Sequence, residues 1–239
     1  MAPKTERMVM MKKQGLLFFT IVLIINILKA QDVGGYYFVM LNTNPNRDEL
    51  PKEKVNEIQA AHLANIDSLA KAGSLVAAGP FNGGGGLFIL KAESLPQAQT
   101  IMNSDPAIKA NRFITELYPM RLNMGSICPV GENYEMTEYQ FVKYQPVKEK
   151  LEEMSADKLL KLQMKHVKFL KEVVHPVHFI AEAGFQPEKG GFFVSQKGEE
   201  DAIDKFLRND PLTKSGCFKA ELKILWIAKG TFCENAEIR

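Results

Sequence analysis

The sequence predicts an α+β protein in which one chain of 239 residues folds as two similar units. A short motif occurs twice: Asp105-Pro106 returns as Asp210-Pro211, and each pair is followed at the same distances by Lys and Phe. Hydrophobic periods and turn residues also divide each half in one order, which is strand, helix, strand, strand, helix, strand. With 46% hydrophobic and 24% charged residues, the composition is that of a globular protein with a packed core.

The first unit alternates apolar strands with amphipathic helices. Its long first helix ends at Gly73, and the glycine run from Gly83 to Gly86 precedes a strand. A glycine run in that place predicts a hairpin turn and not a phosphate-binding loop, which would open a helix. The expected elements are a strand at 35–41, a helix at 51–71, strands at 74–80 and 86–92, a helix at 95–103 and a strand at 112–122.

The second unit repeats this order. Its Gly-Gly pair at 190–191 matches the pair at 85–86, and His166 matches His62 once a single insertion is allowed. The expected elements are a strand at 139–147, a helix at 156–174, strands at 177–184 and 191–196, a helix at 199–207 and a strand at 217–228. The expected boundaries are a signal peptide at 1–30, a first domain at 31–125, a turn-rich linker at 126–136 and a second domain at 137–239.

Each unit has the split βαβ order, also called ferredoxin-like. Such a unit carries its helices on one face of the sheet, so the other face is apolar and needs cover. Two units in one chain can cover each other. We therefore expect the two sheets to pack face to face about a pseudo-twofold axis as a barrel-like body with the helices outside. This would be an intramolecular pseudo-dimer, and the sequence does not determine whether chains assemble further.

The first 30 residues have the pattern of an export signal. Two lysines precede an uncharged, mostly apolar run at 15–28, which is shorter than the roughly 20 residues of a membrane span. We predict cleavage between Ala30 and Gln31 and a periplasmic or secreted protein with no stable membrane anchor. The alternative is an uncleaved anchor. The residues before Met11 have the character of an extended or misassigned start.

The charge distribution argues against a nucleic-acid partner. The net charge of +2 includes five basic residues and one acidic residue in the first 30 positions, so the rest of the chain carries about −2. That balance provides no basic surface for a phosphate backbone. Small molecules or proteins are the expected partners.

Three cysteines, Cys128, Cys217 and Cys233, would lie in a compartment where disulfides persist. Cys128 and Cys233 occupy equivalent places just beyond the two repeats. A bridge between them is one alternative, and free thiols are the other. No Cys/His cluster has zinc spacing, so no metal site is expected.

Five short motifs follow one another in the first unit: Ala-His-Leu around His62, Ala-Gly-Pro at 78–80, Gly-Gly-Leu-Phe at 85–88, Asp105-Pro106, and a final strand that contains Glu. In this order they resemble the YCII-related (YciI-like) family, and the resemblance covers nearly all of residues 35–122.

The second unit, at 138–228, resembles the same family more loosely. It keeps His166, Gly184, a Gly-Gly-Phe-Phe run and the Asp-Pro pair at Asp210, but it has no Pro after Gly184. The chain therefore resembles two tandem YCII-like copies.

The resemblance implies a dimeric α/β barrel and a His and an Asp that share a pocket. Family members are suspected enzymes, and a few relatives act on ring-hydroxylated or lactone substrates without a metal or an organic cofactor. Carried over position by position, the candidate catalytic residues are His62 with Asp105 and His166 with Asp210.

Such a pair suits proton transfer, because a carboxylate on one ring nitrogen selects the tautomer and raises the basicity of the other nitrogen. We expect a lyase or isomerase that acts on a small cyclic or aromatic molecule. Three alternatives remain, and one of them is a purely structural or protein-partner role. Asp before Pro is also a favoured helix start, so Asp105 and Asp210 can be caps alone. The chain can also be a non-catalytic small-molecule-binding protein of the cell envelope.

Overall fold

A computed structural model describes residues 35–131, 133–172 and 177–234 of the chain. The predicted signal peptide at 1–30 and its cleavage site lie outside the described residues. In these ranges, no helix has the length and apolar character needed to cross a membrane.

The first half of the described chain has the predicted order of strands and helices, with ends that differ by a few residues. Ser94 caps the helix α3 by accepting a hydrogen bond from Gln97 N, and Pro96 lies in its first turn. A short helix after Asp105 was not predicted as a separate element. The elements are β1 (Gly35–Thr43), α2 (Lys52–Lys71), β2 (Leu75–Pro80), β3 (Gly86–Ala92), α3 (Leu95–Asn103), α4 (Pro106–Lys109) and β4 (Phe113–Met124).

The second half has the same succession of strands and longer helices, with additional short helices. The helix expected at 156–174 is described only to Glu172, because 173–176 lie outside the described ranges. The elements are β6 (Met136–Pro146), α5 (Lys148–Glu152), α6 (Ala156–Glu172), β7 (Phe179–Gly184), a 3-10 turn η1 (Pro187–Lys189), β8 (Gly191–Gln196), α7 (Glu200–Leu207), α8 (Pro211–Lys214) and β9 (Phe218–Ala228).

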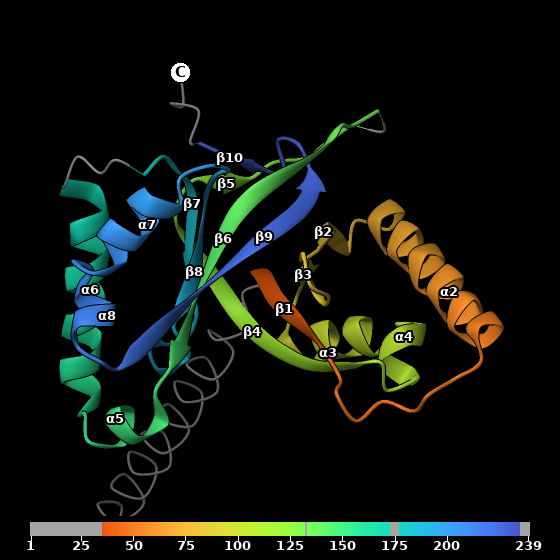
Figure 1. Cartoon of the computed structure of the whole chain (residues 1–239), viewed down its shortest axis with the longest axis horizontal. Coiled ribbons are helices and arrows are strands. Elements are labelled where there is room, and N and C mark those ends of the chain that lie inside the picture. The colour runs from red at the N-terminus through yellow and green to blue at the C-terminus, as the bar shows by residue number, and fades with distance from the viewer. Residues whose placement is uncertain (1–34, 132, 173–176, 235–239) are drawn as a thin grey trace, which may run out of the picture. The chain divides into compact units, whose positions relative to one another are not determined.

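These strands form an antiparallel sheet in the order β2-β3-β1-β4-β7-β8-β6-β9. The two halves join where β4 pairs with β7, with Arg121 opposite Gly184. The two ends of the order also meet, because Phe81 forms a bridge with Leu225 and Asn82 N donates to Ile224 O at 2.9 Å. The fold is therefore α+β with a curved antiparallel sheet whose edges touch, here called the closed sheet (Figure 1).

The closed sheet has an inner and an outer face. Successive side chains of a strand point to opposite faces, so in β1 Phe38 and Met40 point inward while Tyr37 and Val39 point outward. The inward side chains of both halves form one apolar cluster, called the inner cluster. Its largest members are Phe38, Met40, Phe81, Leu87, Ile89, Met120, Tyr139, Phe141, Phe185, Phe192, Leu225 and Phe232.

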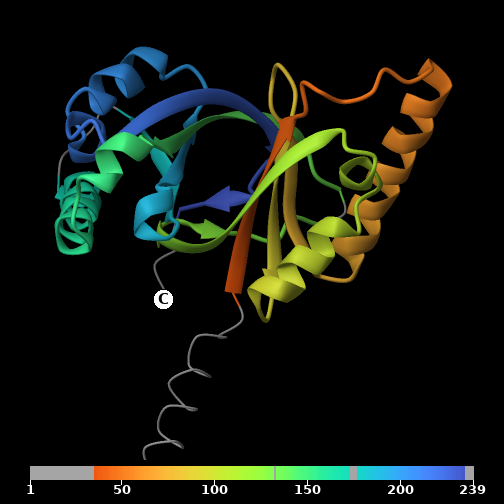
Figure 2. The ribbon, with the colours of Figure 1, turned by 90° about the horizontal axis from the view of Figure 1, so that it is seen from below.

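The helices cover the outer face on two sides. Figure 1 shows α2, α3 and α4 on one side of the strands and α5 to α8 on the other, and Figure 2 shows the same separation from below. Each helix group packs on its own half of the sheet through a separate apolar cluster. The candidate histidines of α2 and α6 therefore lie between helix and sheet, on opposite sides of the molecule.

The glycine run forms the predicted hairpin turn between β2 and β3. Gly83, Gly84 and Gly85 all have positive φ, which L side chains rarely adopt. A Cβ at Gly85 would also lie 2.2 Å from Leu41 O. Both the backbone conformation and the space require glycine there.

The segment expected to be a linker contains ordered pairing. A two-stranded sheet joins β5 (Ser126–Ile127) to β10 (Phe232–Cys233). Beside it a disulfide links Cys128 to Cys233, with their Cα atoms 6.1 Å apart. The structure therefore confirms the predicted alternative of a bridge between Cys128 and Cys233. Cys217 is free and buried.

The disulfide is expected to stabilise the fold by restricting the unfolded chain, since it closes a loop with a sequence separation of 105. The double variant Cys128→Ser, Cys233→Ser should lose about 2–4 kcal/mol in free energy of unfolding, measured by denaturant titration. Reductant should shift the midpoint of the wild type and leave that of the variant unchanged. Only free thiols in non-reducing mass spectrometry would contradict the bridge.

Candidate functional site

The first candidate pair lies between α2 and the start of α4. Asp105 is the N-cap of α4, and its Oδ1 accepts hydrogen bonds from Ala107 N at 2.8 Å and Ile108 N at 3.2 Å. Its Oδ2 accepts from His62 Nδ1 at 2.7 Å and from Asn65 Nδ2 at 3.3 Å. One carboxylate thus holds a helix start with one oxygen and an imidazole with the other. The helix-cap prediction is confirmed, and the cap leaves the histidine contact intact.

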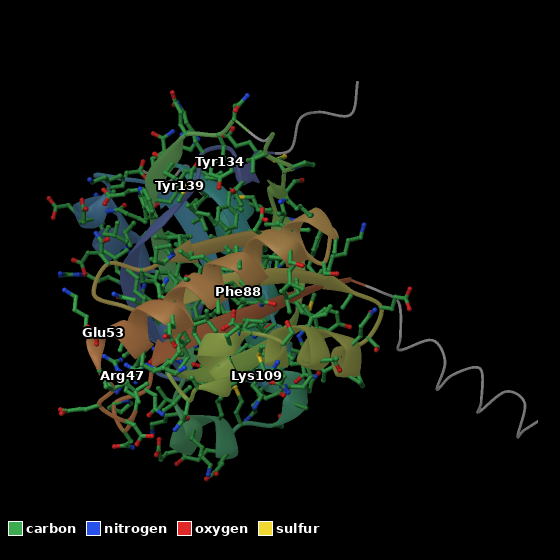
Figure 3. The ribbon with its side chains drawn as sticks, turned by 90° about the vertical axis from the view of Figure 1, so that its right-hand side faces the viewer. Arg47, Glu53, Phe88, Lys109, Tyr134 and Tyr139 are labelled. Carbon is green, nitrogen blue, oxygen red and sulfur yellow. A yellow bond between two sulfur atoms is a disulfide. The ribbon has the colours of Figure 1, made fainter. Side chains whose placement is uncertain are left out.

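The geometry of α2 explains why two of its residues reach the same carboxylate. Residues three apart on a helix lie on one face, so His62 and Asn65 both point at Asp105. The His62 ring lies near the rings of Phe88 and Phe113, with centroids 5.9 and 6.0 Å away. Phe88 is labelled in Figure 3, which faces α2. His62 is the only residue of α2 that is buried, which sets it apart from the rest of this polar helix.

The charge state of Asp105 follows from these contacts. Burial alone would raise its pKa, but the hydrogen bond and positive charge of His62 and the two backbone N–H groups lower the pKa below its ordinary value. The carboxylate can then only accept, so His62 Nδ1 carries a proton, and in the neutral form of the ring Nε2 has the free lone pair.

The second candidate pair repeats the contact with a different arrangement of oxygens. His166 Nδ1 donates to Asp210 Oδ1 at 2.6 Å, and Leu212 N donates to the same oxygen at 3.3 Å. Asp210 Oδ2 and the Tyr144 hydroxyl are buried and make no hydrogen bond of good geometry among the described residues. Burial, and then the negative charge of nearby Asp210, raise the pKa of Tyr144. The Tyr144 hydroxyl therefore interacts with the Asp210 carboxylate without a hydrogen bond of full geometry.

A second carboxylate, Glu182, faces His166 and was missed by the sequence analysis. Its Oε1 lies 3.9 Å from His166 Nε2, which is too far for a direct hydrogen bond. Its Oε2 is buried without a hydrogen-bond partner among the described residues. Burial raises the pKa of Glu182 despite the opposing effects of His166 and Asn123. A glutamate inside the otherwise apolar strand Phe179–Gly184 is the sequence signal that points to it.

Two neighbouring spaces lie beside this second pair. A small cavity of about 20 Å³ is lined by His166, Glu182 and Tyr144, among others, and it has room for about one water-sized group. A larger pocket of about 600 Å³, here called the outer pocket, lies between α6 and the β4–β7 junction. Asn123, Gln163, Val167 and Gly184 line both spaces. The outer pocket therefore leads toward the His166–Glu182 pair.

A polar cluster inside the closed sheet was also missed by the sequence analysis. Glu116 of β4 accepts from Asn42 at 2.9 Å, from the Tyr118 hydroxyl at 2.7 Å and from Lys143 of β6 at 2.7 Å. Burial raises the pKa of Glu116, but the bonds from Lys143 and Tyr118 outweigh burial and leave the pKa below its ordinary value. The bond from Lys143 of β6 to Glu116 of β4 therefore joins the two halves of the sheet.

The described ranges contain no group of three or more His, Cys, Asp or Glu side chains placed to hold a metal ion. The pairs described above are the main clusters of ionisable side chains between helix and sheet in those ranges.

Comparison with protein families gives one match. Residues 36–121 match the family model of the YCII-related domain. The chain therefore carries a YCII-related domain over its first half. No curated protein sequence matches the chain.

Solved structures with a similar arrangement have low sequence identity to the chain. A heme-binding protein from Thermus thermophilus has 13% identity and a TM-score of 0.42, with 82% of this chain and 91% of that chain covered. An anthrone oxidase-like protein has 10% identity and a TM-score of 0.40, with coverage of 84% and 95%. The siroheme decarboxylase NirDL has 6% identity and a TM-score of 0.41, with coverage of 79% and 71%.

The two roles of Asp105 can be separated by substitution. Asp105→Asn keeps an oxygen for the N–H groups of α4, whereas Asp105→Ala loses the cap and also leaves His62 without its partner. We expect the Ala variant to lose about 2–4 kcal/mol in free energy of unfolding, measured by denaturant titration, and the Asn variant clearly less. Ser94→Ala removes a cap alone and is the control. An Asp105→Ala cost no larger than that of Ser94→Ala would contradict the double role.

The pKa of Glu182 predicts a pH dependence of stability. Because its pKa is raised in the folded state, Glu182 keeps its proton there at pH values at which the unfolded chain has lost it. The folded protein therefore loses stability as pH rises above the ordinary carboxyl pKa of 4.5. Glu182→Gln should therefore gain free energy of unfolding relative to the wild type as pH rises from 4 to 8. Denaturant titrations across that range test this, with the exposed Glu93→Gln as control. A constant difference across the range would rule it out.

Proposed function

We propose that this chain, which carries a YCII-related domain at residues 36–121, is an enzyme that transfers protons with His–Asp pairs. The pairs are His62 with Asp105 and His166 with Asp210. The reaction class is a lyase or an isomerase that acts on a small cyclic or aromatic molecule without a metal or an organic cofactor.

The observation that carries the proposal is the way each imidazole is held. In both halves, Nδ1 is bonded to a buried aspartate, at 2.7 Å for His62 and 2.6 Å for His166. The proton on Nδ1 leaves Nε2 as the basic nitrogen, and the aspartate stabilises the imidazolium that forms when Nε2 takes a proton.

The second pair has the fuller set of groups for a reaction. His166 Nε2 would take a proton from a substrate carbon next to a carbonyl group, and protonated Glu182 would give its proton to the oxygen of the resulting enolate. To complete an isomerisation, His166 would give its proton to a different carbon atom of the enol while Glu182 takes back the hydroxyl proton. To complete an elimination, Glu182 would take back the hydroxyl proton while the leaving group departs with the proton from His166. His166 Nε2 and Glu182 Oε1 lie 3.9 Å apart and are not hydrogen-bonded to each other. Each of them would therefore be available to bond a substrate atom.

The organisation of the chain as two tandem YCII-like copies in a pseudo-twofold dimeric α/β barrel belongs to the same proposal. Its support is the symmetry of the contacts. Phe38 of β1 and Phe141 of β6 stack with their rings 7° from parallel. Each half also adds its second strand to the last strand of the other, through the β4–β7 pairing and the Phe81–Leu225 bridge.

Export of the chain, with cleavage near Ala30 and Gln31, is likewise proposed. The disulfide between Cys128 and Cys233 supports it, because such bridges persist in oxidising compartments.

A specific observation favours a second candidate function, a non-catalytic binding protein. The cavity of about 20 Å³ beside His166 is too small for a substrate ring, whereas the outer pocket of about 600 Å³ has the size of a small-molecule site. A molecule that stays in the outer pocket would not contact His166 Nε2.

Proton exchange in D₂O distinguishes these functions without knowledge of the natural substrate. We expect the protein to exchange carbon-bound protons of some members of a panel of small lactones and cyclic or aromatic ketones, followed by loss of the ¹H NMR signal. His166→Asn should lower the exchange rate by about 10²–10⁴-fold, as should Asp210→Asn to a lesser degree. The exchange rates of His62→Asn and Asp105→Asn show how much the first pair contributes to proton exchange.

Circular dichroism and the midpoint of unfolding show that each variant is folded. Exchange that survives in the combined His62→Asn, His166→Asn variant would disprove catalysis by the histidines. Binding of panel members without any exchange would leave the binding protein as the function.

A further inference from the structure

We infer that the outer pocket selects small organic carboxylates that have an apolar ring or chain. The inference deepens the proposed function, since it names the class of molecule that would reach the His166–Glu182 pair. It is tested by binding alone, so it stands or falls separately from catalysis.

The charges around the outer pocket have one sign. Arg121 of β4 and Lys168 and Lys171 of α6 line it, and none of its lining residues is acidic. The nearest carboxylate that the structure connects to this pocket is Glu182, which is buried in the small cavity beyond it. A pocket lined by cations over an apolar floor concentrates anions, because the low-dielectric wall strengthens the field.

Arg121 is the cation best placed to receive a ligand. Its side chain is exposed and makes no hydrogen bond or ion pair with another described residue. It stands opposite Gly184 in the β4–β7 pairing, so no side chain of the neighbouring residue covers it from that position. A guanidinium can bind both oxygens of a carboxylate at once.

The apolar part of the ligand is inferred from α6. Leu160, Met164 and Val167 lie on one stripe of the helix, at spacings of four and three residues, and all line the outer pocket. Leu160 is 51% exposed and Met164 is 63% exposed, which is unusual for large apolar side chains. Phe185 forms part of the opposite wall. An apolar ring or chain between these residues would remove their surface from water.

The apolar residues and the cationic residues that line the outer pocket occupy different parts of α6. The apolar residues lie nearer its N-terminus, and Lys168 and Lys171 lie in its last turns. Gln163, His166 and Val167 line the small cavity, and they lie on α6 just before these lysines. A carboxylate bound there would place the adjoining carbon atoms of the ligand toward His166.

The test compares two ligands that differ in charge. We expect 1-naphthoate to bind the full chain about tenfold more tightly than its neutral counterpart 1-naphthamide, by calorimetry and by ¹⁵N NMR shifts in α6. Raising the salt concentration should weaken binding of the naphthoate only. Inorganic phosphate should bind more weakly than naphthoate, because it has no apolar part.

Variants locate the contact. Arg121→Gln should weaken naphthoate binding about tenfold, and Lys171→Gln should weaken it by a smaller factor. Arg47→Gln is the matched control, because Arg47 is an exposed arginine on the α2 side of the molecule, away from α6 (Figures 1 and 3). The unfolding midpoint of each variant confirms its fold, and the salt dependence of the wild type needs no variant.

Equal affinities for the acid and the amide would overturn the inference, as would unchanged naphthoate binding in both Arg121→Gln and Lys171→Gln. His166→Asn should lower the rate of proton exchange and keep naphthoate binding. Carboxylate binding without exchange in the wild type would therefore support this inference while it removes the proposed catalysis.

Discussion

Phe38 and Phe141 stack with their ring centroids 6.0 Å apart at the middle of an apolar cluster that both halves of the chain share. Each half alone would expose that inner face to water, and burial of apolar surface is the main favourable term in folding. The contact therefore holds the sheet closed and leaves the outer faces for the helices. Because the inner face of the closed sheet is filled, α2 and α6 can pack only on its outer face. Both His–Asp pairs therefore lie between the helices and that outer face.

On each outer face, a buried aspartate determines the local arrangement. Asp105 and Asp210 are both fully buried and both begin a four-residue helix. A buried carboxylate without partners would be costly, and the backbone N–H groups of the helix start together with one imidazole supply those partners. The structural role and the proposed chemical role thus depend on the same contacts, so we expect substitution of either aspartate to change stability as well as the proposed activity.

The two halves differ in what surrounds these pairs. Asp105 has an additional amide donor in Asn65. In the second half, Glu182 stands opposite Phe193, where Ala78 stands opposite Phe88 in the first. In the proposed function, the extra buried carboxyl beside His166 would give this site an acid as well as a base, while the first site would have a base alone. In our proposal the difference matters because the outer pocket, where a ligand would bind, lies beside this second site.

Local pattern alone determined much of this protein: the order of strands and helices, the glycine turn, and the helix starts at Asp105 and Asp210. These depend on residues near in sequence or on a motif that occurs twice. The partners of the two histidines were implied by the resemblance to the YCII-related family. The pairing of β4 with β7 decided the rest, because it brings Arg121 to α6 and Asn123 to Glu182. Lys143 reaches Glu116 across the closed sheet for the same reason. Hydrophobic periodicity states which face of a strand is buried, but not which distant strand will lie beside it, so only the tertiary structure could assemble that site.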